Sequence, residues 1–177
     1  MGADKGLIYI RAEYPLAIKR LKIAIDQARQ YGLLGNDILG TGFNFDIELR
    51  YGAGAFVCGE ETALIHSMEG GRGEPTVKPP FPSDAGYLGK PTVVNNVETL
   101  AYVATIIDKG ADYFKSIGTK DSMGGKVFSV SGDCAVKGIY ELPLGMTMQE
   151  FVDLFGDGDT KAVQVGGDSG FCVPRKK

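Results

Sequence analysis

Residues 52–62 read Gly52-Ala-Gly-Ala-Phe-Val-Cys-Gly-Glu-Glu-Thr62, and this stretch decides how the chain folds. Before it, residues 43–50 alternate between apolar and polar side chains, which is typical of a half-buried strand. After its glycines, residues 60–68 favour a helix that ends at Gly70. The stretch is therefore predicted to be a glycine-rich turn that joins a strand to a helix.

Two elements upstream extend this unit. Residues 7–11 form a short apolar run with β-branched side chains, which predicts a strand. Pro15 opens a predicted helix in which apolar residues recur at helical spacing, and Gly32 and Gly35 end it. A strand, a helix and a strand in this order predict an α/β layer.

A third helix is expected after the two adjacent asparagines. Asn95 is its predicted N-cap, and Glu98 follows three residues later, as in a capping box. The helix is expected to end at Gly110. Its apolar stripe would consist of Val97, Leu100, Ala101, Ala104 and Ile107.

The pattern changes beyond residue 124. The polar, glycine-rich residues 111–124 are the best candidate for a linker. Thr147 and Glu150 form a capping box that predicts a helix ending at Gly156. Strands are predicted at residues 127–131, 139–142 and 162–165. This order is compatible with a β-grasp fold, so we predict two domains, residues 1–118 (α/β) and residues 119–177 (a small α+β unit).

The composition excludes several classes of protein. Glycine makes up 26 of the 177 residues, but it follows no repeating period and only 8 prolines accompany it, which excludes collagen and low-complexity linkers. The net charge is −3 and the basic run at residues 175–177 is short, which argues against a nucleic-acid binder. No apolar run is long enough to cross a membrane and no signal peptide is recognisable, so we expect a cytoplasmic protein without direct membrane insertion.

The three cysteines, Cys58, Cys134 and Cys172, are far apart and form no C-x-x-C pair. This pattern favours reduced thiols over a disulfide framework. Zinc and iron–sulfur sites need clustered thiolates, so no metal site is predicted within the chain.

Three short segments are candidates for a binding site. Glu60 and Glu61 begin a helix after a glycine-rich turn, where carboxylates suit hydroxyl, ring-nitrogen or amide donors, although they would equally complement the helix dipole. Residues 78–82, Lys-Pro-Pro-Phe-Pro, are expected to be an extended, stiff strip that holds a cation beside an aromatic ring, or simply a structural loop. The asparagines at 95 and 96 are suited to an amide-rich ring or a phosphate, or to helix capping alone.

Taken in order, these three segments resemble the flavin-bearing, NADH-oxidising subunit of respiratory complex I. The same family includes matching subunits of NAD(P)-linked hydrogenases and formate dehydrogenases. The resemblance extends over nearly the whole chain, and includes residues 8–15 and 31–35. Residues 127–132 through 166–170 look like the family's soluble-ligand-binding β-grasp (ubiquitin-like, SLBB) module.

The resemblance implies that FMN and NADH are bound in one pocket. Glu61, near the reacting rings, would be the candidate catalytic residue, and Phe56 stands where family members often have Tyr. The implied cofactor-binding residues are Gly59, Glu60 and Glu61 at the flavin and nicotinamide, Val94, Asn95, Asn96 and Thr99 at the FMN ring or phosphoribityl chain, and Lys78 and Phe81 at the dinucleotide.

The resemblance also implies a parent protein that is larger than this chain. It would transfer a hydride from NAD(P)H to FMN and pass electrons to iron–sulfur centres in a multi-subunit NADH dehydrogenase, hydrogenase or formate dehydrogenase. The family's glycine-rich loop lies N-terminal to the matched region, and the four cysteines for its [4Fe–4S] cluster lie C-terminal, so those ligands are absent from this chain. We expect a central piece that binds FMN weakly or not at all by itself. The alternative is a non-catalytic β-grasp module that binds a ligand or partner.

Overall fold

The computed structural model describes residues 2–174, and the chain divides into two compact units between Val94 and Asn95. This division lies ahead of the helix that follows the two asparagines, so that helix belongs with the second unit. The domain boundary predicted after residue 118 stays a prediction. The mixed α/β content agrees with the predicted class.

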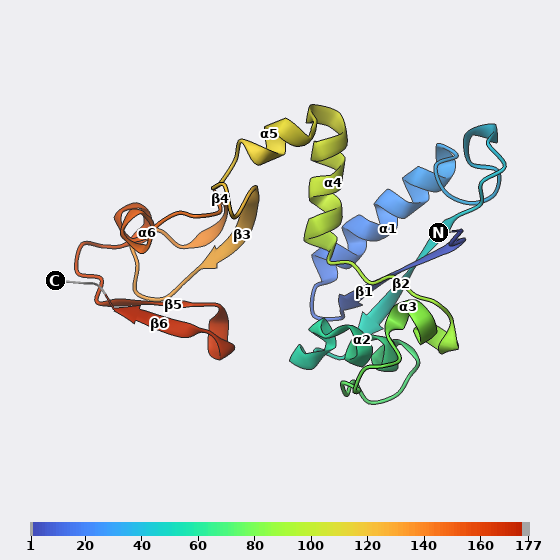
Figure 1. The fold of residues 1–177 in the computed structure, drawn as a ribbon, viewed down its shortest axis with the longest axis horizontal. Helices are drawn as coiled ribbons and strands as arrows, with labels where there is room; N and C mark the ends of the chain where they lie inside the picture. Colours follow the sequence, from blue (N-terminus) through green and yellow to red (C-terminus); the bar gives the residue numbers. More distant parts are fainter. Residues whose placement is uncertain (1, 175–177) are drawn as a thin grey trace. The chain divides into compact units, whose positions relative to one another are not determined.

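The first unit begins with a β–α–β motif. Strand β1 (Lys5–Arg11) and strand β2 (Asp46–Gly52) pair in parallel, and helix α1 (Pro15–Gln30) connects them (Figure 1). Parallel strands require such a crossover, so the predicted α/β layer is confirmed. The predicted start of the second strand was wrong by three residues, because Phe45 forms an isolated bridge with Gly35 and regular pairing begins only at Asp46.

The ends of helix α1 are set by local chemistry. Pro15 occupies the first turn, where its missing N–H costs nothing. Arg29 in the last turn donates from Nε and Nη2 to the two carboxylate oxygens of Asp46, each at 3.0 Å. This bidentate pair joins the end of the helix to the first residue of β2, and it lowers the pKa of Asp46.

The first unit also contains several short helices, of which one precedes β2 and the others follow it. They are the 3-10 turns η1 (Ile38–Gly40), η2 (Phe56–Gly59) and η3 (Tyr87–Gly89), helix α2 (Glu61–Met68) and helix α3 (Pro82–Ala85). The prediction of an extended strip at residues 78–82 was wrong, since the chain bends at residues 78–80 and α3 begins at Pro82. The peptide bonds that precede Pro79 and Pro80 are both cis.

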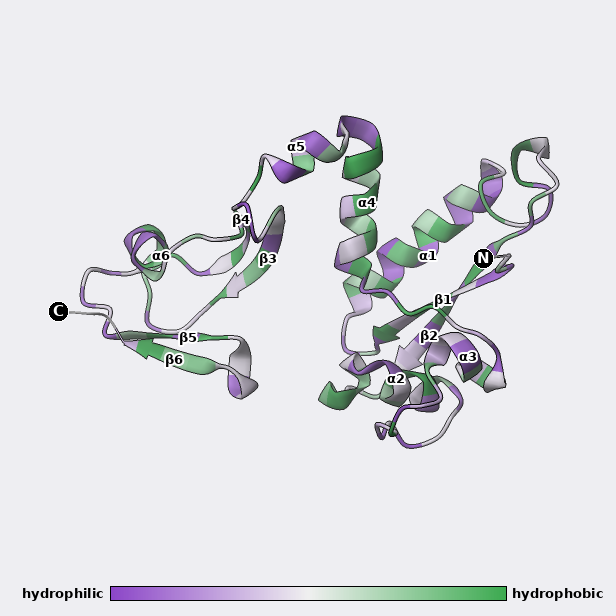
Figure 2. Ribbon diagram, in the orientation of Figure 1, coloured by the Kyte–Doolittle hydropathy of each residue, from purple (hydrophilic) through white to green (hydrophobic). Residues whose placement is uncertain are grey.

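In the residues that the structure describes, the second unit contains three α-helices and two β-hairpins. Helices α4 (Val97–Lys109), α5 (Ala111–Lys115) and α6 (Met148–Phe155) accompany strands β3 (Gly125–Val130), β4 (Gly138–Pro143), β5 (Ala162–Val165) and β6 (Phe171–Pro174), with the 3-10 turn η4 (Gly167–Ser169) before β6. The predicted helices and three predicted strands are confirmed, and so is the capping box of Thr147 and Glu150. Helix α5 occupies part of the predicted linker, and the apolar strand β6 was not predicted (Figure 2).

The strand pairing within this unit is antiparallel. Among the described residues, β3 pairs with β4 and β5 pairs with β6, as two separate two-stranded sheets. Phe155 at the end of α6 is buried and lies against the rings of Phe151 and Tyr140, with both ring-centre distances at 4.8 Å. These rings form the local core, and the union of the two hairpins in one β-grasp sheet stays a prediction.

Candidate functional site

The glycine-rich turn is fixed by residues of strand β1. A Cβ atom at Gly52 would overlap the hydroxyl of Tyr9, so the close approach of β2 to this ring requires glycine. A 2.8 Å hydrogen bond then joins the Tyr9 hydroxyl to that of Ser67 on α2, and burial raises the pKa of Tyr9. Arg11 donates from Nη2 to the carbonyl of Gly54 at 2.7 Å. Tyr9 and Arg11 of strand β1 therefore fix the position of the glycine-rich turn and of helix α2, which follows it.

Glu60 is the N-cap of helix α2. Its Oε2 accepts hydrogen bonds from the backbone N–H of Thr62 at 2.9 Å and of Ala63 at 3.0 Å, and from the Thr62 hydroxyl at 2.5 Å. These donors, led by the Thr62 hydroxyl, lower the pKa of Glu60 to about 2. Glu60 is therefore ionised at neutral pH, and one of its oxygens is fully engaged in ordering the first turn of the helix.

Lys78 neutralises the acidic start of the helix. Its Nζ donates to Oε1 of Glu61 and lies 3.3 Å from Oε1 of Glu60. The hydrogen bond with Glu61 is the main reason that the pKa of Lys78 is raised, so the ammonium group stays protonated. The side chains of all three residues are about one-third exposed. The site is therefore a solvent-accessible ion triad at the N-terminus of α2.

In the sequence, an open glycine and two exposed rings lie close to the residues of this triad. A Cβ added at Gly59 would have no atom within 4 Å, so the backbone before Glu60 is open to a ligand. The Phe56 ring is 86% exposed and that of Phe81 is 52% exposed, although such rings are usually covered. In the described part of the chain, Glu61 uses one carboxylate oxygen for Lys78 and makes no hydrogen bond with the other.

The predicted residues are divided between the two compact units. The first unit brings Glu60, Glu61 and Lys78 together, with Gly59 next to them in the chain, and ends at Val94. Asn95, Asn96 and Thr99 belong to the second unit.

The predicted cap of helix α4 was wrong by one residue. Asn96, not Asn95, is the N-cap, because its Oδ1 accepts the N–H of Glu98 at 2.9 Å. Helix α4 therefore begins at Val97, and Glu98 is too close to the cap to complete a capping box.

Sequence reasoning missed the residues that hold the triad in place. Thr62 was not singled out, although its hydroxyl binds Glu60 and also accepts the N–H of Thr76 at 2.9 Å, near Lys78. The position of Thr62, two residues after Glu60 at the helix start, could have predicted a hydrogen bond from its hydroxyl to that carboxylate. Tyr9 and Ser67 are 58 residues apart, and no local pattern could have paired them.

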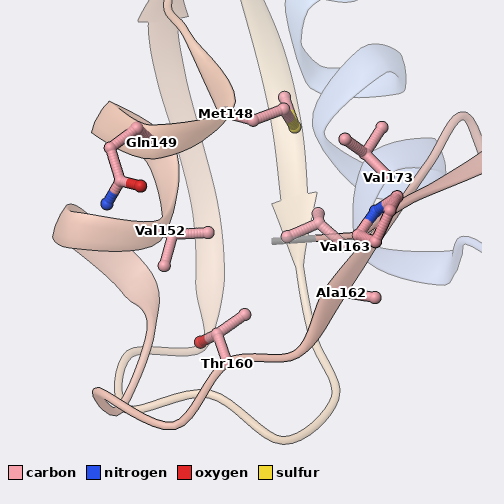
Figure 3. A pocket seen from close by; sticks show the side chains of 8 residues that line it. Met148, Gln149, Val152, Thr160, Ala162, Val163 and Val173 are labelled. Atoms are coloured by element: carbon pink, nitrogen blue, oxygen red, sulfur yellow. The ribbon is translucent and has the colours of Figure 1, made fainter. Parts of the chain in front are cut away.

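A separate cavity of about 280 Å³ lies in the second unit, between α6 and the β5–β6 hairpin (Figure 3). Its lining is mostly aliphatic and contains no predicted site residue; it consists of Met148, Gln149, Val152, Thr160, Ala162, Val163, Val173 and Pro174. Among residues 2–174, no group of three or more His, Cys, Asp or Glu side chains could hold a metal ion, and no helix is long and apolar enough to cross a membrane.

Comparison with known proteins relates this geometry to one family. The family described as the Nuo51 FMN-binding domain matches residues 1–105. The NADP-reducing hydrogenase subunit HndC of Solidesulfovibrio fructosivorans is 60% identical over 99% of this chain, and the NAD-reducing hydrogenase HoxS subunit alpha of Cupriavidus necator is 51% identical over 98%. An NADH-quinone oxidoreductase subunit of Rhizobium meliloti is 46% identical over 98%.

A solved structure agrees with these relatives. The crystal structure of an NAD⁺-reducing [NiFe]-hydrogenase in the H₂-reduced state covers 99% of this chain with a TM-score of 0.87 and 44% sequence identity. The chain spans 37%, 29% and 42% of the three curated relatives named above, and 29% of the chain in the solved structure. The match over residues 1–105, more than half of the chain, shows that this chain belongs to the family of Nuo51 FMN-binding domains.

Proposed function

We propose that this chain is the central part of an NAD(P)H-oxidising flavoprotein subunit. FMN, when bound, supplies the hydride acceptor and passes electrons on to iron–sulfur clusters. The observation that carries the proposal is the ion triad of Glu60, Glu61 and Lys78 after an open glycine turn, in a chain of this family. Relatives named as hydrogenase and NADH-quinone oxidoreductase subunits support the reaction class.

The residues present fit a flavin and a dinucleotide. The exposed rings of Phe56 and Phe81 offer flat apolar surfaces for stacking, and the backbone at Gly59 has no neighbour that a planar ring would displace. Glu61 offers an acceptor for amide or hydroxyl donors, and Lys78 offers a cation for phosphate or ribose oxygens.

Each residue then has a distinct role in the proposal. Glu60 orders the helix start and holds Lys78, whereas Glu61 orients the nicotinamide through its second oxygen. Phe81 stacks on the dinucleotide base. In the second unit, Asn96 keeps α4 in place as its cap, and Asn95 and Thr99 bind the FMN ring or its phosphoribityl chain together with it. Val94, the last residue of the first unit, has the same proposed role.

The partners proposed are other subunits of a multi-subunit hydrogenase, NADH dehydrogenase or formate dehydrogenase. The names of the relatives support the first two. A [4Fe–4S] cluster belongs to the parent protein in this proposal, with ligands outside this chain, and the location is cytoplasmic.

The test uses the protein that contains this chain, purified with any flanking sequence that its gene encodes. We expect a yellow protein with flavin absorbance that oxidises NADH or NADPH with an artificial electron acceptor. Glu61→Gln should keep the flavin and slow oxidation about tenfold or more. Glu74→Gln removes an exposed ion pair with Arg72 and is the matched control. A colourless protein that binds no added FMN would overturn the proposal.

We further propose that residues 119–177 form a β-grasp (SLBB-type) module after a domain of residues 1–118. The order β3, β4, α6, β5 supports this proposal. The second candidate function is a non-catalytic module that binds a ligand or partner, which the aliphatic cavity beside α6 favours. A colourless, folded protein that binds a partner through this module would favour the second function over the first.

A further inference from the structure

Glu98 has a role that differs from the one its motif predicts. Since Asn96 caps α4, the Glu98 carboxylate is not used at the helix start, and it reaches strand β3 instead. Its Oε1 accepts the backbone N–H of Val127 at 2.9 Å, and its Oε2 accepts Nζ of Lys126 at 2.5 Å. Both carboxylate oxygens of Glu98 therefore bind one strand of the β3–β4 hairpin.

The next turn of the helix makes a second contact with the same hairpin. Tyr102 donates its hydroxyl hydrogen to Oε1 of Glu141 on β4 at 2.9 Å. A Cβ at Gly125 would lie 3.1 Å from this hydroxyl, so the close approach of the ring to the start of β3 favours glycine there. The Tyr102 ring also meets Phe114 edge-on, with ring centres 5.4 Å apart.

These polar contacts matter because no residue of α4 is buried. Helices are usually held by an apolar face, whereas Val97 and Leu100 of α4 are 65% and 55% exposed. Glu98 is 25% exposed at its side chain and carries a charge-assisted bond, which is the stronger kind. Glu98 therefore holds the first turn of α4 against the hairpin.

We propose that Glu98 is a positioning residue, through which the β3–β4 hairpin fixes the helix start that binds FMN. This inference rests on the proposed function, because Asn95, Asn96 and Thr99 lie within three residues of Glu98 at the start of α4. The hairpin then has a part in cofactor binding without itself touching the cofactor. Loosening the Glu98 contact should disorder the asparagines and weaken FMN binding.

The experiment measures FMN affinity by quenching of flavin fluorescence in the protein with its natural flanking sequence. Glu98→Ala should weaken FMN binding about tenfold and speed hydrogen exchange of the amides at residues 97–100. Lys126→Met keeps the bond to Val127 and alters only an exposed side chain, so it should fold normally and weaken binding about threefold.

The matched control is Glu150→Ala in the same unit. Glu150 also accepts one backbone N–H and one side-chain donor, both from Thr147, but it lies on α6. Glu150→Ala should lower the melting temperature, as Glu98→Ala does, and should leave the FMN affinity unchanged. If both variants weaken FMN binding equally, or if Glu98→Ala does not weaken it, the inference is overturned. FMN binding by the wild type would still support the proposed function in that case. A wild-type protein that binds no FMN would overturn both.

Discussion

The Nζ atom of Lys78 lies 3.3 Å from Oε1 of Glu60. The same Nζ atom donates to Glu61, which lies 17 positions before Lys78 in the chain. The ammonium group of Lys78 thus pairs with two adjacent carboxylates at the start of α2. The arrangement keeps the net charge of the cluster at −1, which leaves a single acceptor charge beside the open backbone of Gly59.

Replacing Lys78 by Met should affect both stability and binding. Without the ammonium group, the two adjacent carboxylates lose their shared cation, and we expect a loss of up to about 1 kcal/mol in the free energy of unfolding. NAD(P)H affinity should fall about tenfold in the flanked protein, measured by equilibrium titration. Lys5→Met is the control, because Lys5 pairs with Glu48 at 2.7 Å in another surface ion pair. Equal effects on NAD(P)H affinity would contradict the assignment.

The acid sensitivity of the first unit should depend on Glu60. Its pKa falls from 4.5 to about 2 on folding, so its contribution to stability is complete above pH 4.5 and is lost as the pH drops towards 2. Glu60→Gln should therefore show a shallower fall in unfolding free energy between pH 4.5 and 2 than the wild type. Urea unfolding at several pH values measures this difference. Parallel curves for the two proteins would show that Glu60 does not have this pKa.

Gly59→Ala should separate folding from cofactor binding. The added methyl group meets no atom of the protein, so the free energy of unfolding should stay within about 0.5 kcal/mol of the wild type. The same methyl group would occupy the space proposed for the flavin, and FMN affinity should fall. Gly52→Ala is the opposite case, because its methyl group would displace Tyr9 and cost about 1–3 kcal/mol of stability. Calorimetry and FMN titration of both variants test this contrast, and an unchanged FMN affinity in Gly59→Ala would exclude the flavin from this space.

The three cysteines should react with a thiol reagent in a fixed order. Cys172 is exposed, Cys134 is partly exposed, and Cys58 is only 6% exposed. Since attack requires access of the reagent, Cys172 should react first and Cys58 only as the first unit opens. Mass spectrometry of timed samples identifies the labelled residue. Rapid labelling of Cys58 in the native protein would show that the turn before Gly59 is not packed as described.

Local sequence signals predicted the elements of the fold well. Pro15 marks the first turn of α1 and the Thr147–Glu150 pair marks α6, because both features act within one turn of helix. Strand β2 was misplaced because the alternation of apolar residues continues through Phe45, while pairing depends on the partner strand. Strand β6 was missed because Phe171 to Pro174 is too short to show a period.

The candidate site was predictable in its residue types and less so in its contacts. The family resemblance points to Glu60, Glu61 and Lys78, but Lys78 lies in a bend at residues 78–80, where the prolines predicted an extended strip. The sequence also did not reveal which of Asn95 and Asn96 is the N-cap of α4. Either asparagine satisfies the rules for a cap, and only backbone geometry selects Asn96.

Since Asn96 caps helix α4 and Asn95 does not, substitutions at the two neighbouring asparagines should have different effects. A library of variants sorted for folded protein would reject many changes at Asn96 and accept most at Asn95, since only Asn96 satisfies a helix N–H. In the proposed function both asparagines bind FMN, so the same library sorted for flavin colour should reject changes at both. Two adjacent, identical residues would thus leave distinct signatures in the two screens.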